Sequence, residues 1–540
     1  MKRIAFIIAA ALIVACRGYE TMVVNPEFEA SDVDHYMILS RIERADTATV
    51  VYADVYHLPN YWVYLSSGGK LRDSKGKTYK LLACEGFQLD KQVFMPASGT
   101  MSPVLYFEPV DKEEGVVDYI DLDENNETIT GIKLYNVKHD EPVRCVLKGE
   151  VIDRPQSSRL LLLKAGEDAL SAKMTYIPVH DGKFEYTLYA NAEEAYELIF
   201  SEEIRKGSWY PVDFIAETGM LDFTLNPDDR REENVVKGGK YTDAYRAVMD
   251  TLTKETRLLS SELQRLLEEN RYYTPEFSAL REQSIALIKN DPTKRKAIQE
   301  QLSQSAREGN SLSEDAKALN KERERVREVY VNDLLEYVKA HVDIIGYALL
   351  VKITRETIFL TATAPMLTIF HDAYEKKFPR HPYTSLMQSY EQATGIQAGK
   401  PCPDGSVLDA STGKEVRLAD LIKGNKVTLV HLWMSWCSPC RAHGMEMIPV
   451  YEMYKDKGFA VIGISRDQKR IMNMVVERDK YPWVNLLDQN DEQHSLWTKF
   501  GISNAGGADF LVDGQGNFLA VGTTPDKIKK ILQELLDGFE

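Results

Sequence analysis

The sequence predicts a multidomain protein with β-rich, β-sandwich-like domains at the N-terminus, an α-helical region in the centre and an α/β domain at the C-terminus. Three observations support this fold class. Short β-branched and aromatic runs separated by turn residues come first, a stretch rich in Leu, Glu, Lys, Arg and Gln at helical spacing follows, and strand-like and helix-like segments then alternate. A chain of 540 residues is also too long for a single hydrophobic core.

Residues 1–16 are predicted to be a lipoprotein signal peptide. Lys2 and Arg3 precede an apolar stretch, residues 4–15, that is too short for a stable membrane span. The tetrapeptide Ile13-Val14-Ala15-Cys16 resembles the bacterial lipobox, in which the cysteine becomes the lipidated first residue of the mature protein. An ordinary signal peptide with a chance cysteine is the alternative.

A lipid anchor on Cys16 would hold the protein at a membrane surface outside the cytoplasm, where disulfides persist. We therefore expect the periplasmic side of a bacterial cell envelope. Arg17 stands where some bacteria place the aspartate that retains lipoproteins in the inner membrane, so the outer membrane is favoured.

Two β-rich domains are expected next, at residues 17–140 and 141–237. In the first, the β-branched run 47–52 suits a strand, and turn signals follow it. In the second, residues 160–163 indicate a buried strand, and residues 179–186 indicate a hairpin that turns at Asp181-Gly182.

Residues 238–394 are predicted to be helical, with Leu252, Leu259, Leu263, Leu266 and Leu267 along one face of a first helix. Pro275, Pro292 and Gly309 are expected to break later segments, and Pro365 to kink or break another. The composition is 44% hydrophobic, which excludes a largely disordered chain. The formal net charge of −16 argues against a nucleic-acid partner.

Residues 395–540 are predicted to form a mixed sheet flanked by helices. The expected strands are 427–433, 459–465 and the hairpin 510–513 with 518–521. The expected helices are 440–457, 468–478, 491–500 and 525–536.

Two cysteines stand at the junction of the first of these strands and its helix, in the segment Trp436-Cys437-Ser438-Pro439-Cys440. A helix start has unpaired N–H groups and partial positive charge, so a cysteine there can have a pKa of about 3.5–7.5 instead of about 8.5. We expect Cys437 on the exposed lip to be the attacking thiolate, and Cys440 to resolve the mixed disulfide.

Trp436 is expected to shield the pair, and Pro439 suits the first helical turn because it lacks an N–H. A zinc half-site and a plain structural disulfide are the alternatives. A structural zinc site needs four ligands, and no second cysteine or histidine pair stands nearby. No metal and no cofactor are therefore expected.

The C-terminal domain resembles the TlpA/ResA-like branch of the thioredoxin superfamily. The matching segments are 399–404, 418–421, 432–441, 458–465 and 510–516. The whole layout is similar to that of multidomain thioredoxin-like lipoproteins of Bacteroidota-type bacteria. The resemblance implies a thioredoxin fold and a membrane-tethered thiol–disulfide oxidoreductase. It would reduce, or less plausibly oxidise, disulfides of envelope proteins, and would need an upstream electron donor.

The sequence departs from this family at three positions. Gly507 falls where the family has the cis-proline that faces the cysteine pair, so we expect a trans or remodelled loop. His431 takes the place of a buried Asp or Asn behind the pair, where it could move protons or serve a structural role. His443 replaces a glutamate and is expected to face solvent.

Two other functions stay open at this stage. A binding or scaffold lipoprotein with a vestigial thioredoxin fold is favoured by Gly507 and by the large upstream region. A peroxiredoxin-type peroxidase is disfavoured, because Met434 stands where those enzymes place a threonine. Cys84 and Cys145 could pair, although buried free thiols are favoured, and Cys402 is a candidate third redox thiol.

Overall fold

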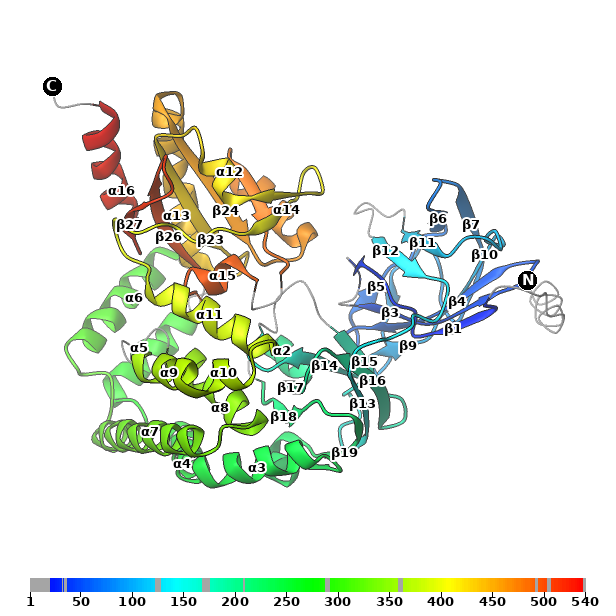
Figure 1. Ribbon diagram of the computed structural model, residues 1–540, viewed down its shortest axis with the longest axis horizontal. Coiled ribbons are helices and arrows are strands. Elements are labelled where there is room, and N and C mark those ends of the chain that lie inside the picture. Colours follow the sequence, from blue (N-terminus) through cyan, green and yellow to red (C-terminus); the bar gives the residue numbers. More distant parts are fainter. Residues whose placement is uncertain are drawn as a thin grey trace. The chain divides into compact units, whose positions relative to one another are not determined.

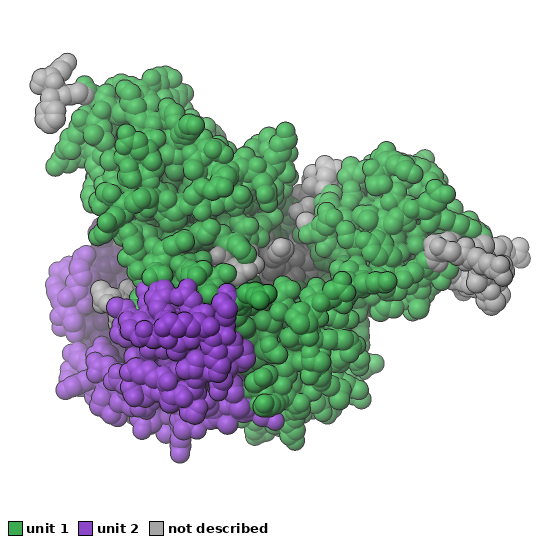
Figure 2. All heavy atoms as spheres, in the orientation of Figure 1, with its two compact units in different colours: residues 1–242, 357–363, 380–540 green, residues 243–356, 364–379 purple. Residues whose placement is uncertain are grey.

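The computed structural model describes residues 20–537, apart from 32, 34–35, 122–127, 168–174, 207–208, 287–291, 358–362, 491–493 and 503–506. Cys16 and the predicted signal peptide therefore lie outside the described residues. The chain divides into two compact units (Figure 2). Unit 1 comprises residues 1–242, 357–363 and 380–540, and unit 2 comprises residues 243–356 and 364–379. None of the described helices combines the length and hydrophobicity that crossing a membrane requires.

The first β-rich segment forms one continuous path of hydrogen-bonded strands, β1-β3-β4-β10-β7-β6-β11-β12-β2, with β9 on β4 and a separate β5-β8 ribbon (Figure 1). Strands from both ends of the path, such as β3 and β12, contribute to one hydrophobic core. The strands are β1 (Met22–Val24), β2 (Ala30–Ser31), β3 (Met37–Arg44), β4 (Thr49–Tyr56), β5 (Trp62–Val63), β6 (Lys70–Asp73), β7 (Thr78–Glu85), β8 (Val93–Phe94), β9 (Thr100–Met101), β10 (Val104–Phe107), β11 (Val116–Ile120) and β12 (Thr128–Lys133).

The second β-rich segment has two four-stranded sheets, β16-β13-β19-β20 and β15-β14-β17-β18, that share one core. Its predicted hairpin turns at Asp181 and Gly182, which both have positive φ, as a tight turn of this kind requires. The elements are β13 (Val143–Val151), β14 (Arg159–Lys164), β15 (Thr175–Pro178), β16 (Lys183–Ala190), β17 (Ala195–Phe200), α2 (Ser201–Lys206), β18 (Val212–Ile215), β19 (Gly219–Leu225), a 3-10 helix (Asp228–Glu233) and β20 (Val235–Lys237).

The middle of the chain is helical, as the sequence predicts. Pro275 and Pro292 each begin a helix, but Leu252 and Leu259 do not share one, because α3 ends at Leu252 and α4 begins at Lys254. The helices are α3 (Lys240–Leu252), α4 (Lys254–Glu268), α5 (Pro275–Ala286), α6 (Pro292–Arg307), α7 (Glu314–Ala340), α8 (Ile344–Thr357), α9 (Ala364–Ile369), a π-helical turn (Phe370–Tyr374), α10 (Glu375–Lys377) and α11 (Pro382–Thr394).

The C-terminal α/β domain is built on a seven-stranded sheet in the order β22-β21-β25-β24-β23-β26-β27. Figure 1 labels β23, β24, β26 and β27 of this sheet. Strands β23, β24 and β25 are parallel, whereas β26 runs antiparallel to β23. Every residue of β23 is buried, as expected for a central strand covered on both faces. The strands are β21 (Ser406–Asp409), β22 (Lys414–Arg417), β23 (Val427–Trp433), β24 (Phe459–Ser465), β25 (Val484–Leu487), β26 (Gly507–Asp513) and β27 (Phe518–Val521).

Helix α13 packs against β23 and β24, and α16 packs against α13. The helices are α12 (Leu418–Ile422), α13 (Ser438–Tyr454) with a 3-10 turn (Lys455–Lys457), α14 (Lys469–Asp479), α15 (Leu496–Lys499) and α16 (Pro525–Leu532) with a π-helical turn (Gln533–Asp537). The predicted strands at 427–433 and 459–465 are found at those positions. The helix expected at 491–500 is shorter, and part of the expected range lies outside the described residues.

Candidate active site

The cysteine pair lies where β23 gives way to α13. Cys437 caps the helix, and its Sγ accepts a hydrogen bond of 3.3 Å from the backbone N–H of Cys440. The two sulfurs are bonded at 1.96 Å, and the Cα atoms are 5.4 Å apart. Pro439 lies in the first turn of the helix, where a missing N–H costs no hydrogen bond. The Cys437 sulfur therefore receives a helix N–H and the positive field of the helix start.

The pair is less accessible than the sequence suggests. Cys437 is only 6% exposed and Cys440 only 8%, so the expected position of Cys437 on an exposed lip is wrong for the disulfide-bonded state. Trp436, in contrast, is 47% exposed. The indole of Trp436, next to Cys437 in the sequence, thus presents an exposed apolar surface, whereas the disulfide is nearly buried.

A buried carboxylate holds the loop before the pair. Asp467 accepts hydrogen bonds of 2.7 Å from both the backbone N–H and the hydroxyl of Ser435, and one of 2.6 Å from the Ser465 hydroxyl. These bonds tie the loop between β23 and α13 to the end of β24. They fix the backbone two residues before Cys437.

Gly507 lies directly against the pair, at the start of β26 opposite Trp433. Its φ is +116°, and a Cβ added there would stand 2.1 Å from the Leu432 carbonyl oxygen and 3.1 Å from Cys440 Sγ. Only glycine fits a backbone that approaches this closely. The structure therefore brings Gly507 to the pair without a side chain between them.

Two histidines share one carboxylate beside the pair. Asp509 lies opposite His431 in the β23–β26 ladder, and its Oδ1 is 2.6 Å from His431 Nδ1. The other oxygen, Oδ2, is 3.3 Å from His443 Nδ1 on α13. His431 and Asp509 are 2% and 4% exposed, whereas the His443 side chain is 40% exposed, so His443 both reaches solvent and contacts the carboxylate.

Sequence reasoning missed Asp509, because the residue is 78 positions away from His431 and only strand pairing brings the two together. The unusual His431 in an apolar strand was the available signal that a polar partner had to lie nearby.

A third buried carboxylate orients the start of α13. Asp479 accepts bonds of 2.7 and 2.9 Å from the Arg441 guanidinium, and this hydrogen bonding is the main reason that the pKa of Asp479 is lowered. Tyr481 packs on the same helix and donates to the Arg441 carbonyl oxygen at 3.3 Å. Its ring lies against Gly444, where a Cβ would stand 2.6 Å from the hydroxyl, and burial raises the pKa of Tyr481.

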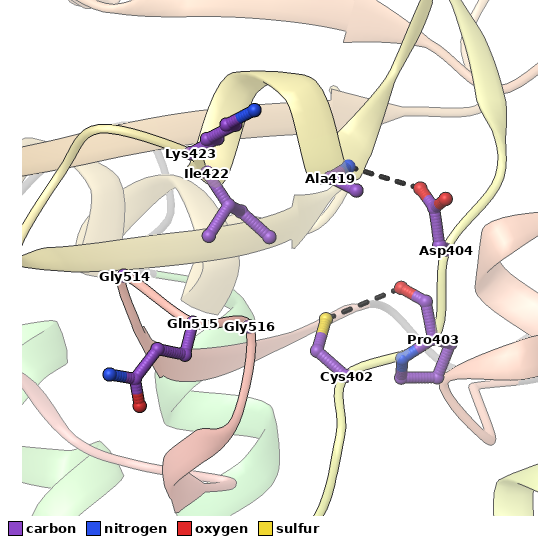
Figure 3. A pocket seen from close by; sticks show the side chains of 9 residues that line it. All are labelled: Cys402, Pro403, Asp404, Ala419, Ile422, Lys423, Gly514, Gln515 and Gly516. Carbon is purple, nitrogen blue, oxygen red and sulfur yellow. Dashed lines mark hydrogen bonds between the residues drawn. The ribbon is translucent and has the colours of Figure 1, made fainter.

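Cys402 lies near the end of β26 that is opposite the cysteine pair. It lines a cavity of about 210 Å³ with the Gly514-Gln515-Gly516 turn, which follows the opposite end of β26 from Gly507 (Figure 3). The Cys402 thiol donates to the Pro403 carbonyl oxygen at 3.3 Å, and burial raises its pKa to about 12. Cys402 is thus not part of the site that holds Cys437 and Cys440.

Cys84 and Cys145 are also unpaired, so the disulfide considered between them is not formed. Burial raises the pKa of Cys84 to about 11 and also raises that of Cys145. Within the described part of the chain, no group of three or more His, Cys, Asp or Glu side chains is arranged to hold a metal ion.

Residues 398–519 match the AhpC/TSA family. The chain is 34% identical over 139 residues to thiol-disulfide oxidoreductase ResA of Bacillus cereus (strain ATCC 10987 / NRS 248), covering 25% of this chain and 75% of that protein. It is 38% identical over 90 residues to ResA of a second Bacillus cereus strain, covering 16% of this chain and 50% of that protein. The chain thus spans about half the length of this last relative.

A relative with a different name is aligned over almost its whole length. The probable phospholipid hydroperoxide glutathione peroxidase of Nicotiana tabacum is 30% identical over 166 residues, which cover 26% of this chain and 96% of that protein.

Proposed function

Because the chain belongs, through its C-terminal domain, to the ResA/TlpA-like thiol-disulfide oxidoreductases of the AhpC/TSA family, we propose that it exchanges electrons with protein disulfides through Cys437 and Cys440. The observation that carries this proposal is the bonded pair at the start of α13, with a helix N–H directed at Cys437 Sγ. That arrangement stabilises a thiolate on Cys437 once the pair is reduced.

The reaction begins with the reduced pair. The Cys437 thiolate attacks one sulfur of the partner's disulfide, a mixed disulfide forms, and the partner's other sulfur leaves as a thiolate. Cys440 then attacks Cys437 Sγ, which restores the Cys437–Cys440 bond and releases the partner's second sulfur. The partner gains two electrons, and an upstream electron donor must reduce the pair again.

Trp436 and Gly507 are the proposed docking surfaces around the pair. Trp436 offers an exposed indole next to Cys437, and Gly507, which has no side chain, brings partly buried main chain beside Cys440. A partner's extended segment can therefore approach the sulfurs over an apolar ring and a bare strand end. Pro439 keeps the first turn of α13 free of a competing N–H.

We place this activity on the periplasmic side of the cell envelope, held to a membrane by a lipid anchor on Cys16. Arg17 after this cysteine favours the outer membrane. The apolar stretch 4–15 and the Cys16 tetrapeptide support this, as does the persistence of disulfides outside the cytoplasm. The proposed domains after the signal peptide are 17–140, 141–237, 238–394 and 395–540. Incorporation of a labelled fatty acid into the full-length chain in cells, and its loss in Cys16→Ala, tests the anchor.

The central experiment follows the pair itself. The full-length protein, incubated with a reductant and then with an oxidised partner protein, should cycle between dithiol and disulfide when thiols are alkylated and the products are weighed by mass spectrometry. Cys437→Ala should stop the cycle, and Cys440→Ala should accumulate mixed disulfides with the partner. A wild-type pair that stays oxidised at every reductant concentration would refute the proposal.

Peroxide reduction is the second candidate, because the tobacco relative is named a peroxidase and 96% of its length is aligned with this chain. Met434 disfavours it, since a thioether cannot donate a hydrogen bond to a peroxide oxygen. Stopped-flow mixing of the reduced protein with hydrogen peroxide distinguishes the two. We expect oxidation no faster than that of a free thiol, and enzyme-like oxidation would favour the peroxidase.

A further inference from the structure

Arg466, which directly follows β24, is a buried cation. It is only 8% exposed, and its Nε has no hydrogen-bond partner among the described residues. Within the same part of the chain, no carboxylate forms an ion pair with its guanidinium. A guanidinium keeps its positive charge in a protein, and burying a charge is costly unless a partner compensates it. The fold therefore holds a positive charge at this position without pairing it.

The loop that contains Arg466 is fastened to the loop that leads to the cysteine pair. Strands β23 and β24 are parallel and end at the same edge of the sheet. Beyond these ends, the Asp467 carboxylate accepts bonds of 2.7 Å from the backbone N–H and the hydroxyl of Ser435. Ser435 stands two residues before Cys437, and Arg466 directly precedes Asp467. Arg466 thus belongs to the edge of the sheet at which the pair lies, the edge where parallel strands of α/β folds bind their ligands.

Asp467, the carboxylate next to Arg466 in the chain, is engaged by other donors. Its Oδ1 accepts from the Ser435 hydroxyl, and its Oδ2 accepts from the Ser435 N–H and, at 2.6 Å, from the Ser465 hydroxyl. Asp467 is also 4% exposed, so its acceptor sites face the interior of the loops. These bonds hold the two loops together, and the donors of Arg466 take no part in them.

The start of α14 adds positive charge to the same edge. The helix begins with Lys469 and Arg470, and its first turn has no acidic residue. The side chain of Gln468, the N-cap residue, makes no capping hydrogen bond to the helix. The amino end of a helix favours negative charge, so basic residues there are electrostatically unfavourable by themselves. In a chain with a formal net charge of −16, this local excess of positive charge favours an anion that arrives from outside.

We propose that Arg466 is a specificity-determining residue, which binds a carboxylate of the partner protein beside the disulfide to be reduced. This rests on the proposed function. A partner's sulfur must reach Cys437 Sγ, so the residues that flank this sulfur approach the edge to which Arg466 belongs. A guanidinium matches a carboxylate with two parallel N–H groups, and such bonds are stronger where water is scarce. Partners with acidic residues beside the disulfide are selected, and basic ones are repelled.

Two low-molecular-weight disulfides of different charge isolate this effect. 5,5′-Dithiobis(2-nitrobenzoate) carries a carboxylate on each ring, 4,4′-dithiodipyridine is uncharged at neutral pH, and both release a coloured thiol. Each is mixed in excess with the reduced full-length protein at low salt, and the first phase is followed by stopped flow. The ratio of the two rate constants measures charge recognition, because a change in thiolate supply at Cys437 alters both constants alike. The Cys437→Ser/Cys440→Ser double variant gives the background from every other thiol.

Arg466→Gln should lower this ratio roughly 10-fold through the anionic disulfide alone, because a charge-assisted bond is lost. An unchanged reaction with dithiodipyridine shows that the variant is folded. Arg466→Lys keeps the charge but not the planar fork, and should retain part of the preference. Lys469→Gln, which removes an exposed positive charge of the same loop and helix start, is the matched control and should stay within twofold of wild type. Added salt should lower the ratio in wild type and change it little in Arg466→Gln.

A pair of cyclic peptides tests the protein partner. The two peptides share one disulfide and one sequence, except that glutamates flank the cysteines in the first and glutamines in the second. With dithiothreitol as electron donor, wild type should reduce the glutamate peptide with the lower KM, and Arg466→Gln should not distinguish the two.

An Arg466→Gln ratio within twofold of wild type would overturn the inference, as would equal wild-type KM values for the two peptides. A wild-type protein that reacts with neither small disulfide faster than the double serine variant would instead contradict the proposed function itself.

Discussion

A cysteine lies near each end of strand β26, one in a disulfide and the other as a free thiol. At one end, Gly507 contacts Cys440 of a bonded pair that a helix N–H supports. At the other, the turn after β26 lines the cavity of Cys402, an unpaired thiol whose pKa burial raises to about 12. The sulfur is the same in both places. The difference teaches that the local field and the nearest partner, and not the residue type, decide whether a cysteine can act as a nucleophile.

The largest expected effect is the difference in disulfide-reducing activity between variants of Cys437 and of Cys402. Cys437→Ala should reduce dithiothreitol-driven reduction of insulin disulfides to the uncatalysed rate, because no other described cysteine caps a helix. Cys402→Ala should keep the rate within about twofold of wild type, as a thiol with a raised pKa supplies little thiolate. Equal losses in both variants would break the comparison between the two ends.

Backbone packing separates the same two ends by stability. Gly507→Ala should lower the free energy of unfolding by about 3 kcal/mol or more, because the new Cβ would clash with the Leu432 carbonyl and the positive φ would be strained. Gly516→Ala, at the other end, has positive φ but open space, and should lose only about 1–2 kcal/mol. Urea titration of both variants measures the difference, and equal losses would mean that the contact at Gly507 is not tight.

Ion pairs allow a third, smaller test. Arg441→Gln breaks a pair in which Asp479 is buried and should cost about 1.5–3 kcal/mol at neutral pH. Arg417→Gln breaks the more exposed pair with Asp404 near Cys402 and should cost less, because solvent screens an exposed ion pair. Thermal or urea unfolding of the two variants checks the ranking, and a larger loss for Arg417→Gln would reverse it.

The Arg441–Asp479 ion pair also predicts how the stability of the protein changes with pH. The folded pKa of Asp479 is lowered, chiefly by the Arg441 hydrogen bonds, so its stabilisation is complete above the unfolded pKa of about 3.9 and disappears as pH falls through the folded value. The stability difference between wild type and Arg441→Gln should therefore shrink below about pH 4. A difference that grows in acid would contradict this assignment.

The smallest expected signal is alkylation of Cys402. With a pKa of about 12, on the order of one Cys402 thiol in 10,000 is ionised at pH 8. Brief iodoacetamide treatment of the reduced protein should label Cys437 and leave Cys402 nearly unmodified, as read by peptide mass spectrometry. Labelling of Cys402 as fast as Cys437 would show that the two ends do not differ in thiolate supply.

The parts of this fold that depend on neighbouring residues could be predicted from the sequence. The strands at 427–433 and 459–465 are continuous apolar runs, and the cysteine pair sits at a helix start that the pattern around Pro439 indicates. The helix starts at Pro275 and Pro292 follow from the preference of proline for the first turn.

The parts of the fold that depend on pairing between distant segments could not be predicted from the sequence. Asp509 reaches His431 through strand register, and Asp479 reaches Arg441 from the end of another helix. The edge strand β22 and its neighbour β21 have only four residues each, so no alternating pattern marked them. The burial of Cys437 follows from the packing of its domain around the disulfide, which a local motif does not encode.

The bare strand end at Gly507 limits how this protein can change by mutation. Because a single added carbon would meet the carbonyl of Leu432, no L-residue can enter that position while both strand ends keep their course. A descendant with any other residue there must first shift one of the two strands. Single substitutions at this position are therefore destabilising, and a second change that moves one of the strands is needed before the surface beside Cys440 can change at little cost.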